Sequence, residues 1–183
     1  MESKGALFLD RDGIINIDKS YVFEFENIEF CEGIIPLIQW ANKKNLYVIV
    51  VTNQSGVARG YYNEDNVIKL HQQMNDHLTK ENAHVDSWIF STYHPKAIKP
   101  EHFKNPHMRK PLDGMIQEAL KQFPIDLKSS IMVGDKLTDQ IKNDQLKTYL
   151  VQGNYDLTGA ESLVFENLSL FLEYLRSNQA SES

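Results

Sequence analysis

Cysteine is almost absent from this chain of 183 residues, which has a single one at Cys31. A lone cysteine cannot form an intrachain disulfide, which favours a protein of a reducing compartment with Cys31 as a small apolar filler. Apolar runs long enough to span a bilayer are also missing, and the first residues lack the apolar segment of a secretory signal. We therefore expect a cytoplasmic protein with no membrane partner.

Basic residues are the minority among the charged ones. Asp and Glu number 25 against 19 for Lys and Arg, which gives a formal net charge of -6. Nucleic-acid-binding proteins usually carry a basic patch or stripe, so we expect no nucleic-acid partner. An anionic substrate is still compatible with this balance, because a few local cations or a metal ion can outweigh the global charge.

Internal repeats, low-complexity segments and linkers are missing as well. At this length the chain is predicted to form a single domain over residues 1–176, followed by a frayed polar tail over residues 177–183. No predicted helix shows a strong second apolar face, so we expect a monomer.

What is present is a regular alternation of two hydrophobic patterns. Short apolar runs predict buried strands, and stripes with a period of about 3.6 residues predict helices. The predicted strands cover residues 6–9, 46–51, 87–91, 130–134, 148–151 and 163–165. The predicted helices cover residues 33–45, 64–78, 111–123, 136–146 and 168–175. This alternation predicts an α/β fold, a three-layer Rossmann-like sandwich with a mainly parallel sheet.

Carboxylates stand directly after two of the predicted strands. Asp10 and Asp12 follow the first strand, and Asp135 follows the fourth. A buried carboxylate is costly unless it is compensated, and open α/β sheets bind ligands at the carboxyl ends of their strands. Asp10 and Asp135, with a backbone carbonyl near Asp12, supply the hard oxygen ligands that suit Mg²⁺. A carboxylate beside Mg²⁺ can attack phosphorus and form an aspartyl-phosphate.

Groups that can hold an anion are predicted at the same edge of the sheet. Thr52 and Asn53 follow the second strand and offer hydroxyl and amide donors. Lys110 stands just before the helix predicted from residue 111, whose N-terminus also favours anions. Together with a metal ion, Lys110 would offset the repulsion between an attacking carboxylate and a phosphate.

Three histidines, His94, His102 and His107, lie close together in a polar segment. Because no cysteine is nearby and their spacing is irregular, we expect no zinc there. His71 and His77 fall on a predicted helix without an acidic or thiol partner at a matching spacing. We expect both at the surface or at an interface.

Four motifs in this order resemble those of the haloacid dehalogenase phosphatase superfamily: Asp-x-Asp-Gly, a strand followed by Thr-Asn, a lysine, and Gly-Asp-x-x-x-Asp. Longer strings are similar to the heptose bisphosphate phosphatase branch of this superfamily, whose nearest relative is the histidinol-phosphatase domain. These strings cover residues 8–13, 52–60, 109–111 and 133–136. Between Asp12 and Thr52, and again after Gly60, the chain has room for little more than a helix and loops. We therefore expect the capless form of the fold.

This resemblance implies a Mg²⁺-dependent phosphoric monoester hydrolase. Its substrate would be D-glycero-D-manno-heptose 1,7-bisphosphate, a small phosphorylated sugar that loses its C7 phosphate through an aspartyl-phosphate intermediate. The reaction would belong to carbohydrate metabolism, in the synthesis of heptose precursors of lipopolysaccharide.

The resemblance also implies roles for the motif residues. Asp10 would be the nucleophile, and Asp12 would be the general acid that protonates the leaving sugar oxygen and then activates water. Asp10, the carbonyl of Asp12 and Asp135 would hold Mg²⁺. Thr52 and Lys110 would hold the transferring phosphate.

Further residues are expected around this centre. Asp139 would orient Lys110 or the metal shell. Arg109 is the first choice for the distal phosphate, because a guanidinium pairs with phosphate through two hydrogen bonds. Lys136 is expected to close over the same site. The full set of candidates for the rest of the substrate is Asn53, Gln54, Ser55, Arg59, Arg109 and Lys136.

Two alternative functions remain. The same chemistry could act on histidinol phosphate, but the histidinol-phosphatase domain usually has Asp where this chain has Ser55, and residues 58–60 favour the heptose branch. A non-catalytic phosphosugar-binding protein is the alternative of another class. The presence of both Asp10 and Asp12 argues against it, because binding alone needs no acid–base residue. The excess of acidic over basic residues argues against a nucleic-acid 3′-phosphatase.

One departure from the branch concerns a loop in which many members bind structural zinc. The corresponding positions here hold Ser91, Tyr93, Pro106 and Met108. None of these side chains is a suitable zinc ligand. We expect no structural zinc, and a loop that is held by packing. The side chains expected to pack are Tyr93, Pro95, Phe103 and Met108.

Overall fold

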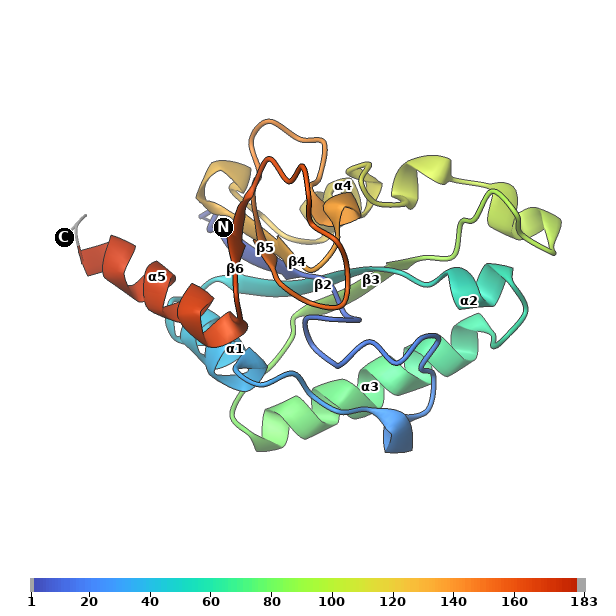
Figure 1. The fold of residues 1–183 in the computed structure, drawn as a ribbon, viewed down its shortest axis with the longest axis horizontal. Coiled ribbons are helices and arrows are strands. Elements are labelled where there is room, and N and C mark those ends of the chain that lie inside the picture. The colour runs from blue at the N-terminus through green and yellow to red at the C-terminus, as the bar shows by residue number, and fades with distance from the viewer. Residues whose placement is uncertain (1, 181–183) are drawn as a thin grey trace.

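The computed structural model describes residues 2–180 and contains a six-stranded sheet (Figure 1). The strands are β1 (Ala6–Leu9), β2 (Tyr47–Asn53), β3 (Ser87–Ser91), β4 (Ile131–Gly134), β5 (Lys147–Val151) and β6 (Leu163–Phe165). Their order is β3-β2-β1-β4-β5-β6, and neighbouring strands are parallel. This arrangement confirms the predicted α/β class, and the order of strands reverses between β1 and β4.

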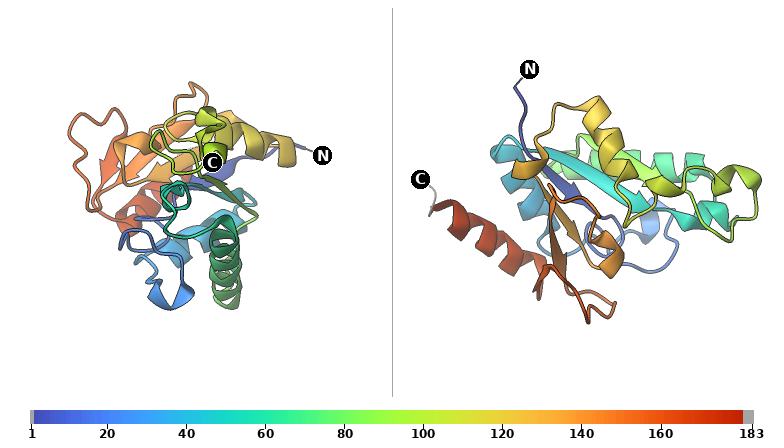
Figure 2. Two further views of the ribbon diagram at one scale, coloured as in Figure 1. Left: turned by 90° about the vertical axis from the view of Figure 1, so that its right-hand side faces the viewer. Right: turned by 90° about the horizontal axis from the view of Figure 1, so that it is seen from above.

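Helices cover both faces of the sheet (Figure 2). They are α1 (Ile34–Lys43), α2 (Ser55–Ala58), α3 (Glu64–Lys80), α4 (Gly114–Gln122) and α5 (Leu168–Ala180). Single 3-10 turns are η1 (Phe25–Asn27), η2 (Pro100–Phe103), η3 (Pro106–Met108), η4 (Leu127–Ser129) and η5 (Leu137–Asp139). Helices α1, α3 and α5 pack on one face and α4 on the other, which gives the predicted three layers.

Alternate residues of the central strands enter two different cores. Leu7 and Leu9 of β1 pack with α1, α3 and α5, whereas Ala6 and Phe8 pack with α4. Side chains of a strand point alternately to opposite faces, so a run that is apolar throughout requires cover on both sides. The four residues of β1 are completely buried, which places Asp10 at the end of a strand inside the protein.

The start of α3 follows directly from its sequence. The side chain of Asn63 accepts a hydrogen bond from the backbone of Asn66, and the side chain of Asn66 accepts one from the backbone of Asn63. This reciprocal pair satisfies amide groups that have no partner within the first turn of a helix. Asn63 is therefore the N-cap of α3.

The helix predicted over residues 136–146 is wrong. Only the turn η5 forms there, because the chain that follows it is held by other parts of the protein. The backbone amide of Lys142 donates to the carbonyl oxygen of Pro111, and Gln140 Oε1 accepts hydrogen bonds from the backbone of Glu161 and Ser162. Helix α4 also begins at Gly114 rather than at residue 111, so Lys110 does not lie at a helix N-terminus.

Helix α5 is longer than predicted and ends at Ala180. It therefore includes the first part of the segment predicted as a frayed tail, whereas residues 181–183 lie outside the described residues. Among the helices that the structure describes, none combines the length and the apolar character needed to cross a membrane. The segment after β1 holds η1 and α1, and the segment after β2 holds α2 and α3, so neither contains a further domain, as expected for a capless fold.

Candidate active site

Three neighbouring strands bring the predicted catalytic residues to one edge of the sheet. Asp10 follows β1, Thr52 lies near the end of β2, and Asp135 follows β4. Because β1 pairs with both β2 and β4, their carboxyl ends meet where the strand order reverses. Open α/β sheets bind their ligands at such a point.

A buried lysine joins two of the acids. Lys110 Nζ lies 2.8 Å from Asp10 Oδ1 and 2.6 Å from Asp139 Oδ1, and all three side chains are almost inaccessible. Burial lowers the pKa of Lys110, but the charges of Asp10 and Asp139 outweigh this effect and raise it. Burial raises the pKa of Asp10 to about 6, although Lys110 acts in the opposite direction. The ammonium of Lys110 therefore lies between the side chains of two acids, Asp10 and Asp139.

Asp135 is the acid without a close partner. Both of its carboxylate oxygens are buried and accept no hydrogen bond from the described residues, while Lys136 Nζ lies 4.0 Å from Oδ1. Burial raises the pKa of Asp135 to about 8. A Cβ at Gly13 would lie 2.0 Å from Asp135 Oδ2, and the backbone there has φ +99, so this close approach requires glycine.

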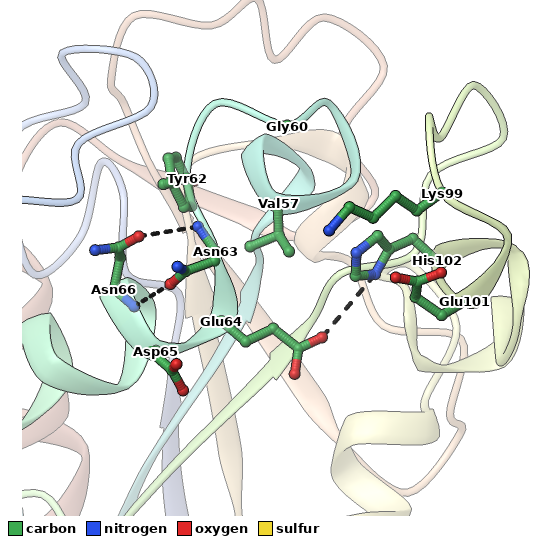
Figure 3. A pocket seen from close by; sticks show the side chains of 10 residues that line it. All are labelled: Val57, Gly60, Tyr62, Asn63, Glu64, Asp65, Asn66, Lys99, Glu101 and His102. Carbon is green, nitrogen blue, oxygen red and sulfur yellow. Dashed lines mark hydrogen bonds and ion pairs between the residues drawn. The ribbon is translucent and has the colours of Figure 1, made fainter.

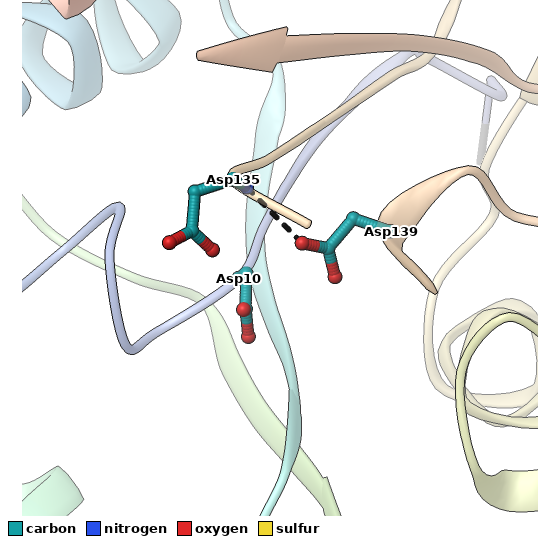
Figure 4. A group of neighbouring side chains, drawn as sticks. All are labelled: Asp10, Asp135 and Asp139. Atoms are coloured by element: carbon teal, nitrogen blue, oxygen red, sulfur yellow. Dashed lines mark hydrogen bonds between the residues drawn. The ribbon is translucent and has the colours of Figure 1, made fainter. Parts of the chain in front are cut away.

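The three acids face one another closely enough to share a cation (Figure 4). One oxygen from each of Asp10, Asp135 and Asp139 lies within 4.8 Å of the others. The unpaired oxygens of Asp135 fit a hard cation well, because an uncompensated buried carboxylate is costly and Mg²⁺ prefers oxygen ligands. Asp139 is already engaged by Lys110 and by two backbone amides, so Asp10 and Asp135 are the better ligands.

Asp12 is held in place by three donors. Arg11 contacts both carboxylate oxygens, Asn16 Nδ2 donates to Oδ1, and Gln54 Nε2 donates to Oδ2. The guanidinium of Arg11 is itself buried and donates to the carbonyl oxygen of Val22. These donors fix the orientation of the Asp12 carboxylate within the site.

Gln54 and Asn53 serve as connectors within the site. Gln54 donates to Thr52 Oγ1 as well as to Asp12, and its own Oε1 accepts a hydrogen bond from Tyr62. Asn53 exchanges two hydrogen bonds with the backbone of Lys110 at 3.1 and 3.4 Å. The predicted substrate residues Asn53 and Gln54 therefore also position Lys110, Thr52 and Asp12.

A polar pocket of about 200 Å³ opens beside Asp12. Its lining residues are Asp12, Asp18, Ser20, Tyr21, Asn53, Gln54, Ser55, Tyr62, Lys136 and Tyr155. Lys136 Nζ lies 3.1 Å from Asp18 Oδ2 and 4.4 Å from the centre of the Tyr155 ring, and the Tyr155 hydroxyl donates to Asp18. The predicted residues Ser55 and Lys136 thus lie on the pocket wall.

Arg59 and Arg109 form a separate group that does not line this pocket. Arg59 Nη2 lies 3.1 Å from His94 Nε2, and Arg109 Nη1 donates to the carbonyl oxygen of Tyr93. Burial and the nearby charge of Arg59 lower the pKa of Arg109. The charges of the two guanidinium groups therefore act on each other, and both groups contact the chain just after β3, at Tyr93 and His94.

The sequence analysis did not identify several residues of the site. Arg11 could have been identified, because a charged residue between two acids after a buried strand needs partners. Asp18 and Tyr155 are 137 residues apart, and no local pattern links them. The surface placement predicted for His71 is wrong: this side chain is buried, stacks on Trp88 and approaches Arg11.

Comparison with known proteins places the chain in a family. Residues 10–158 match the family model described as polynucleotide kinase 3 phosphatase. The D-glycero-alpha-D-manno-heptose-1,7-bisphosphate 7-phosphatase of Campylobacter jejuni is 39% identical over 93% of this chain and 95% of that protein. The chain belongs to the heptose bisphosphate phosphatase family. This family is part of the haloacid dehalogenase phosphatases, as the motifs indicated.

Other family members agree with this assignment. The D-glycero-beta-D-manno-heptose-1,7-bisphosphate 7-phosphatase of Haemophilus influenzae is 40% identical over 73% of this chain and 72% of that protein. The D,D-heptose 1,7-bisphosphate phosphatase of B. bronchiseptica, solved with magnesium and phosphate, superposes with a TM-score of 0.79. That structure is 27% identical and matches 95% of this chain and 99% of its own. Heptose bisphosphate phosphatases named for either anomer thus resemble this chain.

Proposed function

We propose that this protein is a Mg²⁺-dependent phosphatase that removes the C7 phosphate of D-glycero-D-manno-heptose 1,7-bisphosphate. The observation that carries the proposal is the buried group of Asp10, Lys110 and Asp135, in which one acid is paired with a cation and the other has no close partner. Relatives that match this chain over most of their length are named heptose-1,7-bisphosphate 7-phosphatases. The alternatives of a histidinol phosphatase and a non-catalytic binding protein have no comparable support.

Asp10 is the proposed nucleophile. The hydrogen bond from Arg11 and the ion pair with Lys110 both involve Oδ1, which leaves Oδ2 for attack on phosphorus. As the bond from Asp10 to phosphorus forms, the bond from phosphorus to the C7 oxygen breaks. Asp12 donates a proton to that leaving oxygen. A water molecule then attacks the aspartyl-phosphate, gives its proton to Asp12 and releases phosphate, which restores Asp10.

Charge in this centre has to be balanced. Asp10, Asp135 and the backbone carbonyl of Asp12 would hold Mg²⁺, which supplies positive charge for the phosphoryl oxygens when it is bound. Lys110 contributes a second positive charge at a fixed position, and Asp139 keeps it there. Thr52 is proposed to donate its hydroxyl to the same phosphate, while its oxygen accepts from Gln54.

Arg59 and Arg109 are proposed to bind the distal phosphate. Two neighbouring guanidinium groups repel each other unless an anion lies between them, and Arg59 Nε is buried without a hydrogen-bond partner among the described residues. A phosphate can accept paired hydrogen bonds from such groups. Ser55 and Lys136, on the wall of the polar pocket, are proposed to contact the sugar.

The wider setting is part of the same proposal. Residues 1–176 act as one phosphatase domain, because a single sheet carries Asp10, Thr52 and Asp135. We propose a monomer in the cytoplasm that contributes heptose precursors to lipopolysaccharide. With a formal net charge of -6, the chain is not expected to bind nucleic acid.

The test is phosphate release in the presence of Mg²⁺. Heptose 1,7-bisphosphate in each anomeric form is compared with histidinol phosphate, because a site with two guanidinium groups should favour the substrate with two phosphates. We expect kcat/KM for one anomer of the bisphosphate to exceed that for histidinol phosphate by at least about tenfold, equivalent to about 1.4 kcal/mol. Equal or higher kcat/KM for histidinol phosphate would contradict the proposal.

Metal binding should also change how stability depends on pH. In the metal-free protein the folded-state pKa values of Asp10 and Asp135 are raised to about 6 and about 8. Protonation of these groups therefore favours the folded state, and their contribution is lost as pH rises through these values. We expect the Tm in EDTA to fall between about pH 4, the unfolded value, and about pH 8, the folded pKa of Asp135, and Mg²⁺ to reduce this fall, because the cation replaces the protons.

Thermal denaturation at each pH, with EDTA or with Mg²⁺, measures this effect. Asp135→Asn serves as the control, because it removes the carboxylate with the higher pKa and one proposed ligand. This variant should show a shallower fall in EDTA and a smaller response to Mg²⁺. An identical Mg²⁺ response in the variant and the wild type would place the metal elsewhere.

A further inference from the structure

One buried side chain stands out in the segment that joins β3 to Lys110. Of residues 92–109, all of which the structure describes, His102 alone is buried, with 6% of its surface exposed. A segment with so little buried surface has few contacts that fix its conformation. Its position must therefore depend strongly on the contacts of this residue.

His102 contacts the first residue of this segment and a helix outside it. Its Nδ1 lies 3.0 Å from Thr92 Oγ1, directly after β3, and 4.0 Å from Glu64 Oε1, at the start of α3. Both His102 and Glu64 line a cavity of about 530 Å³, and Figure 3 shows their side chains pointing toward each other. The backbone of His102 also accepts a hydrogen bond from His94. The residue thus folds the segment back onto its own start at the end of β3 and faces α3.

The same segment supports both guanidinium groups. The carbonyl oxygen of Tyr93 accepts the hydrogen bond from Arg109, and His94 contacts Arg59. The backbone amide of Ile98 donates to the carbonyl oxygen of Ala58 at 2.8 Å, next to Arg59. A shift of this segment would therefore move the partners of Arg59 and Arg109 together.

We propose that His102 is a positioning residue, which fixes residues 92–109 and thereby the pair Arg59 and Arg109. The effect that this inference predicts on enzyme kinetics rests on the proposed function. The expected packing is confirmed for Met108, which lies against the core formed with α4, whereas Phe103 has 48% of its surface exposed. His102 is a contact that the expected packing did not include.

The test compares His102→Ala with His102→Asn and with Phe103→Ala. The asparagine side chain can retain a polar atom near the position of Nδ1, so it should keep the contact with Thr92. Phe103→Ala is the matched control, because it truncates the neighbouring, exposed side chain. Each variant is assayed with heptose 1,7-bisphosphate and with p-nitrophenyl phosphate, which has no second phosphate.

We expect His102→Ala to raise KM for the bisphosphate about tenfold or more, because displaced guanidinium groups bind the distal phosphate poorly. Its kcat/KM for p-nitrophenyl phosphate should stay close to that of the wild type. His102→Asn should recover most of the affinity, and Phe103→Ala should behave like the wild type. An equal loss on both substrates, an unchanged KM, or the same KM increase in Phe103→Ala would overturn the proposal.

Amide hydrogen exchange gives a readout that does not depend on the substrate. Exchange in peptides covering residues 92–109, including the amide of Ile98, should be faster in His102→Ala than in the wild type, His102→Asn or Phe103→Ala. If the wild type shows no preference for the bisphosphate, the proposed function fails while this measurement still tests His102. Unchanged exchange in His102→Ala would overturn its positioning role.

Discussion

Asp10→Asn is expected to lower kcat by on the order of 10⁴-fold or more, because it removes the nucleophile on which every later step depends. An amide has nearly the same shape as the carboxylate but cannot form the aspartyl-phosphate. The fold should persist, since Lys110 keeps its ion pair with Asp139 at 2.6 Å. The measurement is single-turnover and steady-state phosphate release, together with the Tm of the variant.

Asp144→Asn is the matched control, because Asp144 is an exposed acid away from the catalytic group. It should retain wild-type kcat. Acid quenching of the wild type during turnover should trap phosphate on Asp10, and Asp10→Asn should trap none. Turnover by Asp10→Asn at a rate near that of the wild type would contradict the covalent mechanism.

Lys110→Met is expected to have the largest effect on stability. Lys110 is buried between Asp10 and Asp139, so its removal leaves two buried carboxylates without their cation. Breaking a buried pair by removing one partner typically costs about 3–5 kcal/mol. We expect a loss of that order in the free energy of unfolding in EDTA, measured by urea denaturation, and a severe loss of phosphatase activity.

Two further variants show whether charge or packing causes this loss of stability. Lys142→Met, which removes an exposed lysine, should change the free energy of unfolding little. Adding Asp139→Asn to Lys110→Met should recover part of the lost stability, because one uncompensated charge disappears. Activity should not recover, because the transferring phosphate still lacks Lys110. If the double variant is no more stable than Lys110→Met, the loss comes from packing rather than from charge.

Residues 136–146 show how tertiary contacts can overrule a helical pattern. The segment starts as a helix would, since the carboxylate of Asp139 accepts a hydrogen bond from the backbone of Lys136. The chain then leaves the helical path: Lys142 donates its backbone amide to the carbonyl oxygen of Pro111, and Gln140 Oε1 accepts from the backbone of Glu161. The tertiary contact decides the local structure here, which is why the sequence alone predicted the wrong element.

The sequence by itself determined the strands and the placement of their terminal acids. Apolar runs such as residues 6–9 require cover on both faces, so they predict a parallel sheet whose strand ends carry Asp10, Thr52 and Asp135. The positions of the strands and of the acids are local properties, because they depend only on the residues of each apolar run and on the residues that follow it directly. The motif order added the phosphatase family, which the relatives confirm.

Only the tertiary structure decided which side chains meet. Lys110 reaches Asp10 across most of the chain, Tyr155 reaches Asp18 from 137 residues away, and His102 is buried within an exposed segment. Such contacts depend on where the loops place their residues relative to the edge of the sheet. The periodicity of hydrophobic residues does not predict the course of a loop. The physical reason is that a buried charge or polar group must find its partner in space, wherever that partner lies in the sequence.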